Sequence, residues 1–309
     1  MSAELASRLR GLPAVDLTVV GDLMLDRFVR GEIERMSPEA PVPVLRERTV
    51  REVPGGAANL ARGLAALGAS VRLVGSVGAD AEGARLLAML REAGVDTAGC
   101  LVEEGRATTL KTRFQGPTGQ LLRVDREERG PRDPGRAFAL PAEGEDLLVV
   151  SDYGKGAIDD ALLARLRARG GFVVDPASGR APAAYAGARL VKPNRRELLG
   201  AGDGDPEAAL AVWAGALPGA AILATLGGEG AILREADGAT HRFEAHRREV
   251  FDVTGAGDST MAAIALALAA GVDRLEACRL GMAAGAVAVS RSDTAVVARE
   301  ELVAFLEAR

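Results

Sequence analysis

The chain has 309 residues, 48% of them hydrophobic, and its 38 basic and 43 acidic residues give a formal net charge of −5 at neutral pH. This length and apolar content can build a large core, whereas the negative charge argues against a dedicated nucleic-acid binder, which needs a basic surface. The cysteines Cys100 and Cys278 fit no metal-binding spacing and indicate a reducing compartment. No apolar run follows Arg8 and Arg10 as a signal peptide requires, and the longest apolar stretches are too short to cross a bilayer. We therefore expect a cytoplasmic protein without nucleic-acid or membrane partners.

The first predicted elements are a buried strand and a proline-containing excursion. Residues 15–21 read as a strand that ends in a glycine turn, and Asp22 and Asp26 follow its C-terminal end. Ligands bind at that end of the strands in open α/β sheets, so Asp22 either accepts hydrogen bonds from a hydroxyl-rich ligand or caps the turn. The prolines within residues 27–52 permit extended segments but not helix, and we expect this stretch to leave the main sheet.

A glycine pair opens the next predicted helix. Gly55 and Gly56 precede a segment whose leucines recur on one helical face. Paired glycines let backbone approach a ligand closely, and Asn59 in the first turn offers both a donor and an acceptor. A strand at residues 71–75 and an amphipathic helix around residues 86–90 come next.

A second excursion spans about residues 106–126. Two β-type segments there flank a Gly-Pro-Thr-Gly turn, which is typical of a hairpin. The hairpin carries basic side chains, among them Lys111, Arg113 and Arg123. In a protein of negative net charge, these form either a solvated edge that resists strand pairing or a clamp for an anion.

From residue 146 onward, predicted strands and helices alternate regularly. Strands are expected at 146–151, 172–174, 189–191 and 220–225, with a short β pair around Asp237. Helices are expected at about 158–166, 206–216, 273–290 and 299–308. Such alternation predicts a parallel sheet covered on both faces by helices. We expect one domain over residues 1–309, with a small β lid built from the two excursions.

The most informative stretch is a glycine-rich loop before an apolar helix. Residues 252–258 read Asp-Val-Thr-Gly-Ala-Gly-Asp and lead directly into the apolar segment 261–270. Free backbone N–H groups at a helix N-terminus, together with the helix dipole, form a site for phosphate or for a developing oxyanion. Asp258 lies beside those groups, where a carboxylate serves either as a general base or as a helix cap.

This loop resembles the signature of the ribokinase-like (PfkB) carbohydrate kinases. Other family segments follow in order: the glycine pair with Asn59, the pair Asn194 and Glu197, and the Thr-Leu-Gly-Gly-Glu-Gly turn at 225–230. The resemblance implies a three-layer α/β/α fold with a small β-strand lid, and ATP-dependent phosphorylation of a sugar.

Within the family, the N-terminal half resembles the kinases of D-glycero-β-D-manno-heptose 7-phosphate. The segments that carry this resemblance are 21–27, 37–44, 54–61 and 151–156, of which 37–44 (Ser-Pro-Glu-Ala-Pro-Val-Pro-Val) is the most specific. The resemblance implies transfer of phosphate to the anomeric hydroxyl, giving the 1,7-bisphosphate on the route to ADP-heptose for lipopolysaccharide core or related glycoconjugates.

The resemblance also implies roles for individual residues. Asp258 would take the proton of the anomeric hydroxyl, and the N–H groups of Gly255, Ala256 and Gly257 would stabilise the transferred phosphoryl group. The implied contacts to the sugar are Asp22, Asp26, Gly55, Gly56, Asn59 and Asp152, and those to its 7-phosphate are Lys155, Lys111, Arg113 and Arg123. The implied contacts to the nucleotide are Lys192, Asn194, Thr225, Gly227, Gly230 and Thr254. Asn194 and Glu197 would bind Mg²⁺ through water. The lid would exclude water and limit ATP hydrolysis.

Some features depart from the family pattern or leave its variants open. Residues 291–295 differ from the Gly-Thr type of sequence usual there, which leaves the contacts to the nucleotide and to a monovalent cation such as K⁺ open. Some heptose kinases are fused to an adenylyltransferase domain with a His-x-Gly-His-type motif. The only histidines here are His241 and His246, so we expect a stand-alone kinase. Lid edges often pair between subunits in this superfamily, which favours a homodimer.

Two alternative functions follow from the same residues. The first is the same chemistry on another sugar, such as a ribose- or fructose-phosphate-type kinase; residues 37–44 and the basic lid argue against a neutral sugar. The second is a regulator that binds nucleotide or sugar without catalysis, against which the complete loop around Asp258 argues.

Overall fold

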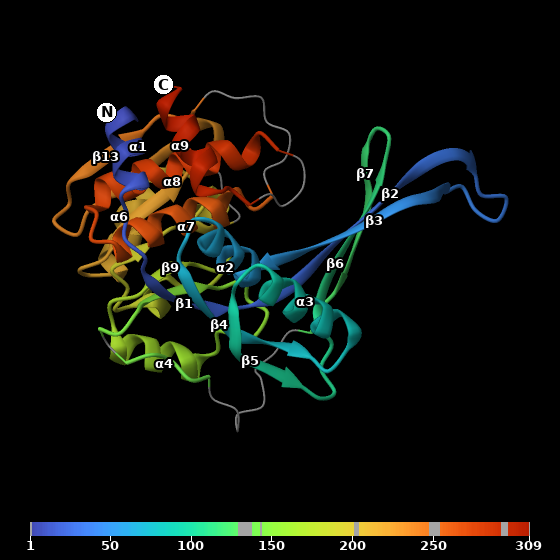
Figure 1. Cartoon of the computed structure of the whole chain (residues 1–309), viewed down its shortest axis with the longest axis horizontal. Coiled ribbons are helices and arrows are strands. Elements are labelled where there is room, and N and C mark those ends of the chain that lie inside the picture. Colours follow the sequence, from blue (N-terminus) through green and yellow to red (C-terminus); the bar gives the residue numbers. More distant parts are fainter. Residues whose placement is uncertain are drawn as a thin grey trace.

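The computed structural model of the protein contains a helix-covered body from which a long β arm projects (Figure 1). The structure describes residues 2–128, 138–142, 144–200, 204–246, 254–291 and 296–308.

Nine strands from these ranges form the sheet at the centre of the body. Their spatial order is β13 (Thr240–Phe243), β12 (Ala231–Arg234), β11 (Ala221–Thr225), β10 (Leu190–Val191), β9 (Val173–Asp175), β8 (Leu147–Ser151), β1 (Asp16–Gly21), β4 (Ser70–Gly78) and β5 (Asp96–Glu103). The strands from β11 to β5 are parallel. At one edge, β12 pairs antiparallel with β11, and β13 pairs antiparallel with β12. The mostly parallel sheet predicted from the sequence is therefore confirmed.

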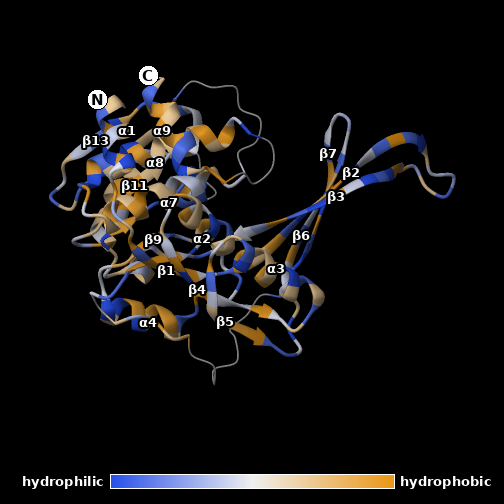
Figure 2. Cartoon of the chain, in the orientation of Figure 1, coloured by the Kyte–Doolittle hydropathy of each residue, from blue (hydrophilic) through white to orange (hydrophobic). Residues whose placement is uncertain are grey.

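Helices cover both faces of this sheet because successive strand residues point to opposite sides. In β8, Val149 belongs to one hydrophobic core, whereas Leu148 and Val150 belong to the other. The core around Val149 includes residues of α1 (Ser2–Arg10), α2 (Ala57–Ala66), α3 (Ala81–Glu92), α7 (Ala256–Ala269), α8 (Arg274–Val289) and α9 (Arg299–Glu307). The opposite core includes residues of α4 (Asp160–Arg169), η1 (Pro182–Tyr185), α5 (Arg195–Leu199) and α6 (Pro206–Ala216). Apolar residues accordingly line the interior of the body in Figure 2.

The arm is a four-stranded sheet, which we call the lid. Its spatial order is β3 (Pro43–Gly56), β2 (Leu23–Met36), β6 (Thr109–Gly116) and β7 (Gly119–Arg126). β2 pairs antiparallel with β3 and parallel with β6, and β7 is the antiparallel hairpin partner of β6. The two predicted excursions therefore meet in one sheet.

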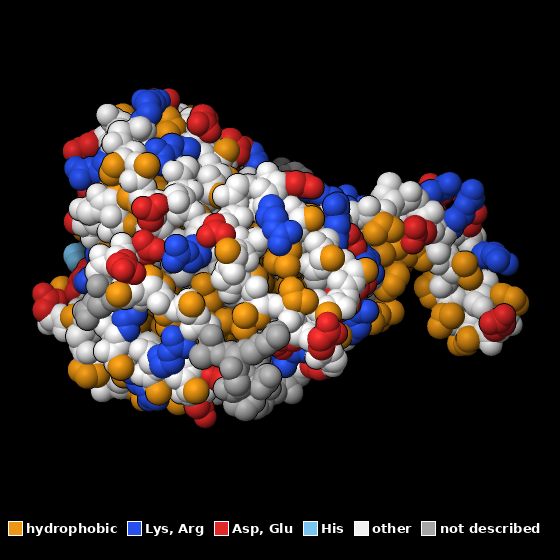
Figure 3. Space-filling view, turned by 60° about the horizontal axis from the view of Figure 1, so that its bottom comes forward, with side chains coloured by type: hydrophobic (Ala, Val, Ile, Leu, Met, Phe, Trp, Pro, Cys, Tyr) orange, Lys and Arg blue, Asp and Glu red, His pale blue; other side chains and the backbone are white. Residues whose placement is uncertain are grey.

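The lid is rooted in the body at one end and exposed at the other. Leu23 and Leu25 at the start of β2 belong to the core of the body, whereas Met36 at its far end is 56% exposed. The space-filling view in Figure 3 shows the far end of the arm standing clear of the body.

The sequence analysis did not predict α1, β5 or α5. β5 is an edge strand whose burial does not alternate cleanly, and such a strand lacks the period of two that identifies half-buried strands. α5 has only five residues, fewer than two helical turns, so no helical repeat can be read from it.

Helix α7 is buried over most of its length because small residues of α8 let the two helices approach closely. The residues of α7 from Asp258 to Leu268 are buried. A Cβ added to Gly281 of α8 would lie 2.5 Å from Cγ1 of Ile264 and 2.9 Å from the carbonyl oxygen of Thr260. The apolar character of α7 thus serves the core, and no helix in the described ranges is both long and apolar enough to cross a membrane.

Two glycine-to-alanine substitutions in helices should therefore change stability in opposite directions. Gly281→Ala should lower the free energy of unfolding by about 1–3 kcal/mol, because the added methyl group overlaps α7. In α6, nothing lies within 4 Å of a Cβ added to Gly215. Gly215→Ala should raise the free energy of unfolding by up to about 1 kcal/mol through its better helix propensity. Urea denaturation measures both changes, and changes of equal sign would contradict this account of the α7–α8 contact.

Candidate active site

Polar side chains from distant parts of the sequence collect at the C-terminal ends of the parallel strands. Asp22 follows β1, Asp152 follows β8, Asp175 ends β9 and Lys192 follows β10. The N-terminus of α7 brings Asp258 to the same edge, as its contacts with Asn59 and Tyr153 show. Ligands bind at this edge in open α/β sheets, so the topology alone marks it as the candidate site.

Asp258 is a buried carboxylate held from both sides. It is 6% exposed. Nδ2 of Asn59 donates a hydrogen bond to its Oδ2 at 2.7 Å, and the hydroxyl of Tyr153 donates to its Oδ1 at 2.9 Å. Burial raises the pKa of Asp258 to about 6, while the two hydrogen bonds oppose the rise and the charge of Asp175 adds to it. A carboxylate with such a pKa can accept a proton near neutral pH, as a general base must.

The loop before α7 ends in a backbone shape that exposes the helix N-terminus. Gly255 precedes α7 with φ 79°, in the left-handed region that glycine tolerates. Gly255 has no side chain that could cap the N–H groups of Ala256 and Gly257, and a helix N-terminus without such a cap suits an anion. Thr254 lies in the turn just before, whereas the predicted loop residues 252 and 253 lie outside the described residues.

A buried cation lies beside this helix terminus. Lys192 is 1% exposed, and its Nζ lies 2.9 Å from Oδ2 of Asp175. A Cβ added to Gly257 would lie 3.6 Å from that Nζ. Burial acts to lower the pKa of Lys192, but the charges of Asp175 and Glu197 outweigh it, so the pKa is raised and the amine stays charged. Ammonium and helix dipole together favour a negative group at Gly257.

The pair Asn194 and Glu197 forms the first turn of α5. Oδ1 of Asn194 accepts a hydrogen bond from the N–H of Glu197 at 3.0 Å, and Oε2 of Glu197 accepts one from the N–H of Asn194 at 2.8 Å. This capping box fixes both side chains. Burial raises the pKa of Glu197 to about 7, and the charge of Asp175 adds to the rise. Added positive charge would be favourable here, which fits a hydrated Mg²⁺ ion.

The predicted nucleotide turn lies next to this pair. Thr225 at the end of β11 forms a parallel bridge with Asn194. Gly227 and Gly230, both with positive φ, shape the following turn η2 (Gly227–Glu229). The structure therefore brings Asn194 and Glu197 next to Thr225 and the turn that follows it.

Asp22 shapes the loop after β8. Its Oδ2 accepts hydrogen bonds from the N–H groups of Tyr153 at 2.8 Å and Lys155 at 3.0 Å, and its Oδ1 accepts one from Ala157 at 2.8 Å. The structure thus supports the capping alternative for Asp22. A carboxylate has about four acceptor positions, so binding of a sugar hydroxyl by Asp22 stays a prediction.

Asp152 is held inside the body. Its Oδ2 accepts a hydrogen bond from the hydroxyl of Tyr185 at 2.9 Å and pairs with Nε of Arg180 at 2.9 Å, while its Oδ1 accepts one from Gly154 N–H. Burial raises its pKa, although Arg180 opposes the rise. These contacts make Asp152 a structural anchor, and its contact with the sugar stays a prediction.

The glycine pair leads from the lid into the site. Gly55 and Gly56 end β3, and Gly56 precedes the first turn of α2, which carries Asn59. A Cβ added to Gly55 would overlap the carboxylate of Asp26. The lid, the glycine pair and the partner of the candidate base are thus one continuous segment.

The lid residues predicted to hold the 7-phosphate, Lys111, Arg113 and Arg123, are each ion-paired. Nη1 of Arg113 lies 2.5 Å from Oδ1 of Asp26, and Nζ of Lys111 lies 3.2 Å from Oδ2 of Asp125. The side chains of Lys111 and Arg113 are only 14% and 13% exposed, whereas that of Arg123 is 51% exposed. Lys111 and Arg113 are therefore enclosed instead of forming a solvated edge.

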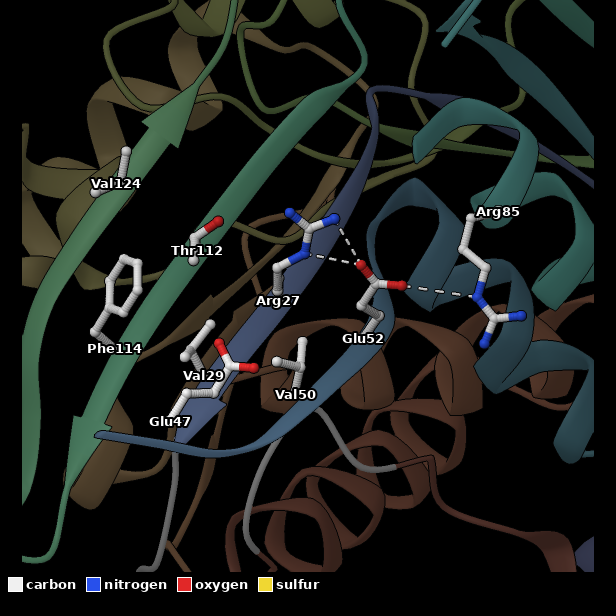
Figure 4. A pocket seen from close by; sticks show the side chains of 9 residues that line it. All are labelled: Arg27, Val29, Glu47, Val50, Glu52, Arg85, Thr112, Phe114 and Val124. Carbon is white, nitrogen blue, oxygen red and sulfur yellow. Dashed lines mark hydrogen bonds and ion pairs between the residues drawn. The ribbon is translucent and has the colours of Figure 1, made fainter. Parts of the chain in front are cut away.

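A cavity of about 650 Å³ lies on the face of the lid opposite to the one that carries Asp26, Lys111 and Arg113. Figure 4 shows Val29, Val50 and Phe114 around it, with Glu52 paired to the guanidinium groups of Arg27 and Arg85. Side chains alternate along a strand, so these residues face away from their neighbours Asp26, Lys111 and Arg113. The cavity is therefore separate from the cluster around Asp258.

Sequence reasoning assigned no role to two residues of the site, Tyr153 and Asp175. Both lie in segments that it singled out, directly after or at the end of a predicted strand. Although Tyr153 as a whole is 40% exposed, the enclosure of its hydroxyl and the charge of Asp258 raise its pKa well above the ordinary value, so the hydroxyl keeps the proton that it donates. A polar residue at a strand's C-terminal end was the available signal for both.

A buried carboxylate beside a helix N-terminus and an ammonium group, on an α/β sheet with a β lid, is an arrangement that suits phosphoryl transfer to a small molecule. The chain belongs to the pfkB family of carbohydrate kinases, which it matches over residues 15–300. It is thus an ATP-dependent sugar kinase.

Curated relatives agree with this assignment. The chain is 42% identical to the bifunctional protein HldE of Azorhizobium caulinodans and 43% identical to that of Caulobacter sp. strain K31, over 94% and 98% of its own length. It spans 64% and 65% of those relatives, slightly less than two thirds.

Solved structures share the fold at low sequence identity. The ribokinase of Thermotoga maritima gives a TM-score of 0.76 at 21% identity, covering 96% of this chain and all of that one. The ribokinase of Arabidopsis thaliana complexed with ribose and ATP gives 0.74 at 20% identity, covering 96% and 99%. The ribokinase-like fold predicted from the sequence is confirmed.

The raised pKa of Asp258 should appear in the pH dependence of stability. The folded protein binds this proton more tightly than the unfolded chain, whose aspartates titrate near 3.8. The stabilisation is thus fully present below 3.8 and is lost as the pH rises through about 6. Asp258→Asn should therefore be more stable than the wild type near pH 8, by up to about 3 kcal/mol.

Urea denaturation near pH 8 and near pH 5 tests this expectation. The advantage of Asp258→Asn should shrink by about 1 kcal/mol or more at the lower pH, because the wild-type carboxyl group is then protonated in the folded state. Asp16→Asn, at an exposed aspartate that begins β1, is the control for the removal of one acidic group from the chain. An advantage that is equal at both pH values would contradict the raised pKa.

Proposed function

We propose that the protein phosphorylates the anomeric hydroxyl of D-glycero-β-D-manno-heptose 7-phosphate with ATP. The product is the 1,7-bisphosphate, on the route to ADP-heptose for lipopolysaccharide core or related glycoconjugates. The observation that carries the proposed chemistry is the buried Asp258, with its pKa of about 6, beside the free N-terminus of α7 and the ammonium of Lys192.

In the proposed reaction, Asp258 takes the proton of the anomeric hydroxyl group. The oxygen of that hydroxyl group attacks the γ-phosphorus of ATP. The new O–P bond forms as the bond to the ADP oxygen breaks. The N–H groups of Gly255, Ala256 and Gly257, together with Lys192, would stabilise the negative charge on the transferred group. Tyr153 and Asn59 hold the carboxylate in place for the transfer.

The sugar is assigned to the region between the base and the lid. Asp22, Asp26, Gly55, Gly56, Asn59 and Asp152 are the proposed contacts to its hydroxyl groups. Lys155, with Lys111, Arg113 and Arg123 of the lid, would hold the 7-phosphate, which prefers charge-assisted donors. Resemblance to heptose 7-phosphate kinases through residues 37–44 supports this substrate.

The nucleotide is assigned to the edge around η2. Lys192, Asn194, Thr225, Gly227, Gly230 and Thr254 are its proposed contacts. Asn194 and Glu197 would hold the waters of a Mg²⁺ ion, which when bound neutralises charge on the nucleotide phosphates. A monovalent cation such as K⁺ is a further proposal; the residues 292–294 that bear on it lie outside the described residues.

The organisation of the protein is also part of the proposal. The relatives are called bifunctional and are longer than this chain, as expected of heptose kinases that are fused to a second catalytic domain. We propose a single kinase domain over residues 1–309, acting in the cytoplasm. A homodimer is supported by the exposed apolar side chains Leu122 and Val124 of the lid, which are 56% and 47% exposed.

Phosphorus NMR with Mg-ATP tests the substrate and the base together. We expect an anomeric phosphate signal with heptose 7-phosphate but not with fructose 6-phosphate or ribose. Asp258→Asn should lower kcat by about 10²–10⁴-fold, because general base catalysis is lost. Its affinity for the sugar phosphate, measured by calorimetry, should stay within a few-fold of the wild type.

Two outcomes would overturn parts of the proposal. Turnover of fructose 6-phosphate or ribose in place of the heptose would leave the kinase chemistry standing and overturn the substrate. Unchanged turnover in Asp258→Asn would overturn the role of the base.

The role of Glu197 has its own test. Glu197→Gln should raise the Mg²⁺ concentration needed for half-maximal activity by about 10–100-fold, as loss of a group that orients metal-bound water does. Glu229 is the matched control because it is 69% exposed and lies in the neighbouring turn. An equal Mg²⁺ requirement in Glu197→Gln and Glu229→Gln would argue against the assignment.

A further inference from the structure

Two of the three lysines of the chain converge on one carboxylate at the border between lid and body. Glu127 directly follows β7, and its Oε2 lies 2.5 Å from Nζ of Lys155 and 3.6 Å from Nζ of Lys111. Lys155 comes from the loop after β8 in the body, and Lys111 comes from β6 in the lid. The three side chains are only 12–14% exposed. One carboxylate oxygen therefore links the two parts of the molecule.

In the contacts of the described residues, three cations (Lys111, Lys155 and Arg123) meet two carboxylates (Glu127 and Asp125) around this oxygen. Lys111 also pairs with Asp125, which in turn holds Nε of Arg123 at 2.9 Å. Two enclosed ammonium groups that share one anion repel each other when that anion is removed. The place occupied by the carboxylate of Glu127 is thus one that favours an oxyanion.

The loop after β8 connects this place to the candidate base. The N–H groups of Tyr153 and Lys155 both donate to Oδ2 of Asp22, so the two residues are held at a fixed separation. The hydroxyl of Tyr153 reaches Asp258, whereas the ammonium of Lys155 reaches Glu127. A substrate with a reacting hydroxyl at one end and an oxyanion at the other matches the two ends of this loop.

We propose that Glu127 occupies the place of the substrate's phosphate group, and that a sugar carrying a phosphate displaces it from Lys111 and Lys155. This inference rests on the proposed function and adds a residue that determines specificity. A phosphate dianion offers more charge and more acceptor oxygens than a carboxylate, so it competes for the same donors. A neutral sugar brings no anion and leaves Glu127 in place.

Affinity for inorganic phosphate, measured by calorimetry without nucleotide, tests this inference. Glu127→Gln keeps the shape of the side chain and removes its charge, so phosphate should bind about tenfold more tightly than to the wild type. Glu128→Gln is the matched control, because the neighbouring Glu128 is exposed and accepts a hydrogen bond from Ala107 N–H instead. It should bind phosphate as the wild type does. Lys155→Gln in the Glu127→Gln background should abolish the gain.

Steady-state kinetics with heptose 7-phosphate give the second readout. KM for the sugar phosphate should fall in Glu127→Gln by a factor similar to the gain in phosphate affinity, with little change in kcat. If Glu127 instead binds a hydroxyl group of the sugar, KM will rise and phosphate affinity will not change, which overturns the inference. Unchanged or weaker phosphate binding in Glu127→Gln overturns it as well. Absence of turnover with the heptose would overturn the proposed function while leaving the phosphate measurement to decide about Glu127.

Discussion

The burial of one carboxylate at the start of α7 is the constraint on which the rest of the site depends. An ionised aspartate inside a protein is unfavourable unless hydrogen bonds and cations compensate for the lost water. Here Asn59 from α2, Tyr153 from the loop after β8 and Lys192 after β10 supply that compensation. Three segments far apart in the sequence are thereby drawn to one point, and the pKa that remains is suited to proton transfer.

A second carboxylate organises the site in a different way. The carboxylate of Asp22 accepts hydrogen bonds from three backbone N–H groups, those of Tyr153, Lys155 and Ala157. These hydrogen bonds fix the shape of the loop after β8. That loop carries Tyr153 to Asp258 and Lys155 to the border of the lid. Replacement of Asp22, which is 1% exposed, would therefore alter the positions of both Tyr153 and Lys155.

The fold and the family could be predicted from the sequence, whereas the contacts between residues of the site could not. Alternation of apolar strands and helices gave the parallel sheet, and the loop ending in Asp258 gave the family, because both signals are local. The partners of those residues could not be read in the same way. Tyr153 and Asp175 reach the site only through the pairing of β1, β8, β9 and β10. The ion pairs that enclose Lys111 and Arg113 likewise depend on which lid strands are neighbours, so the sequence could not show that these basic residues are already paired with carboxylates.

The two long strands of the lid, β2 and β3, each have one end beside the candidate active site and the other end far from it. β2 begins one residue after Asp22, and β3 ends one residue before the helix that carries Asn59. Fourteen extended residues span about 45 Å, so each strand carries its exposed end far from the chemistry. A rotation of the arm through a small angle displaces its exposed end far more than its root, and the same rotation turns the backbone next to Asp22 and Asn59. The exposed end of the arm is therefore joined by continuous backbone to Asp22, which shapes the loop after β8, and to the helix whose Asn59 contacts Asp258.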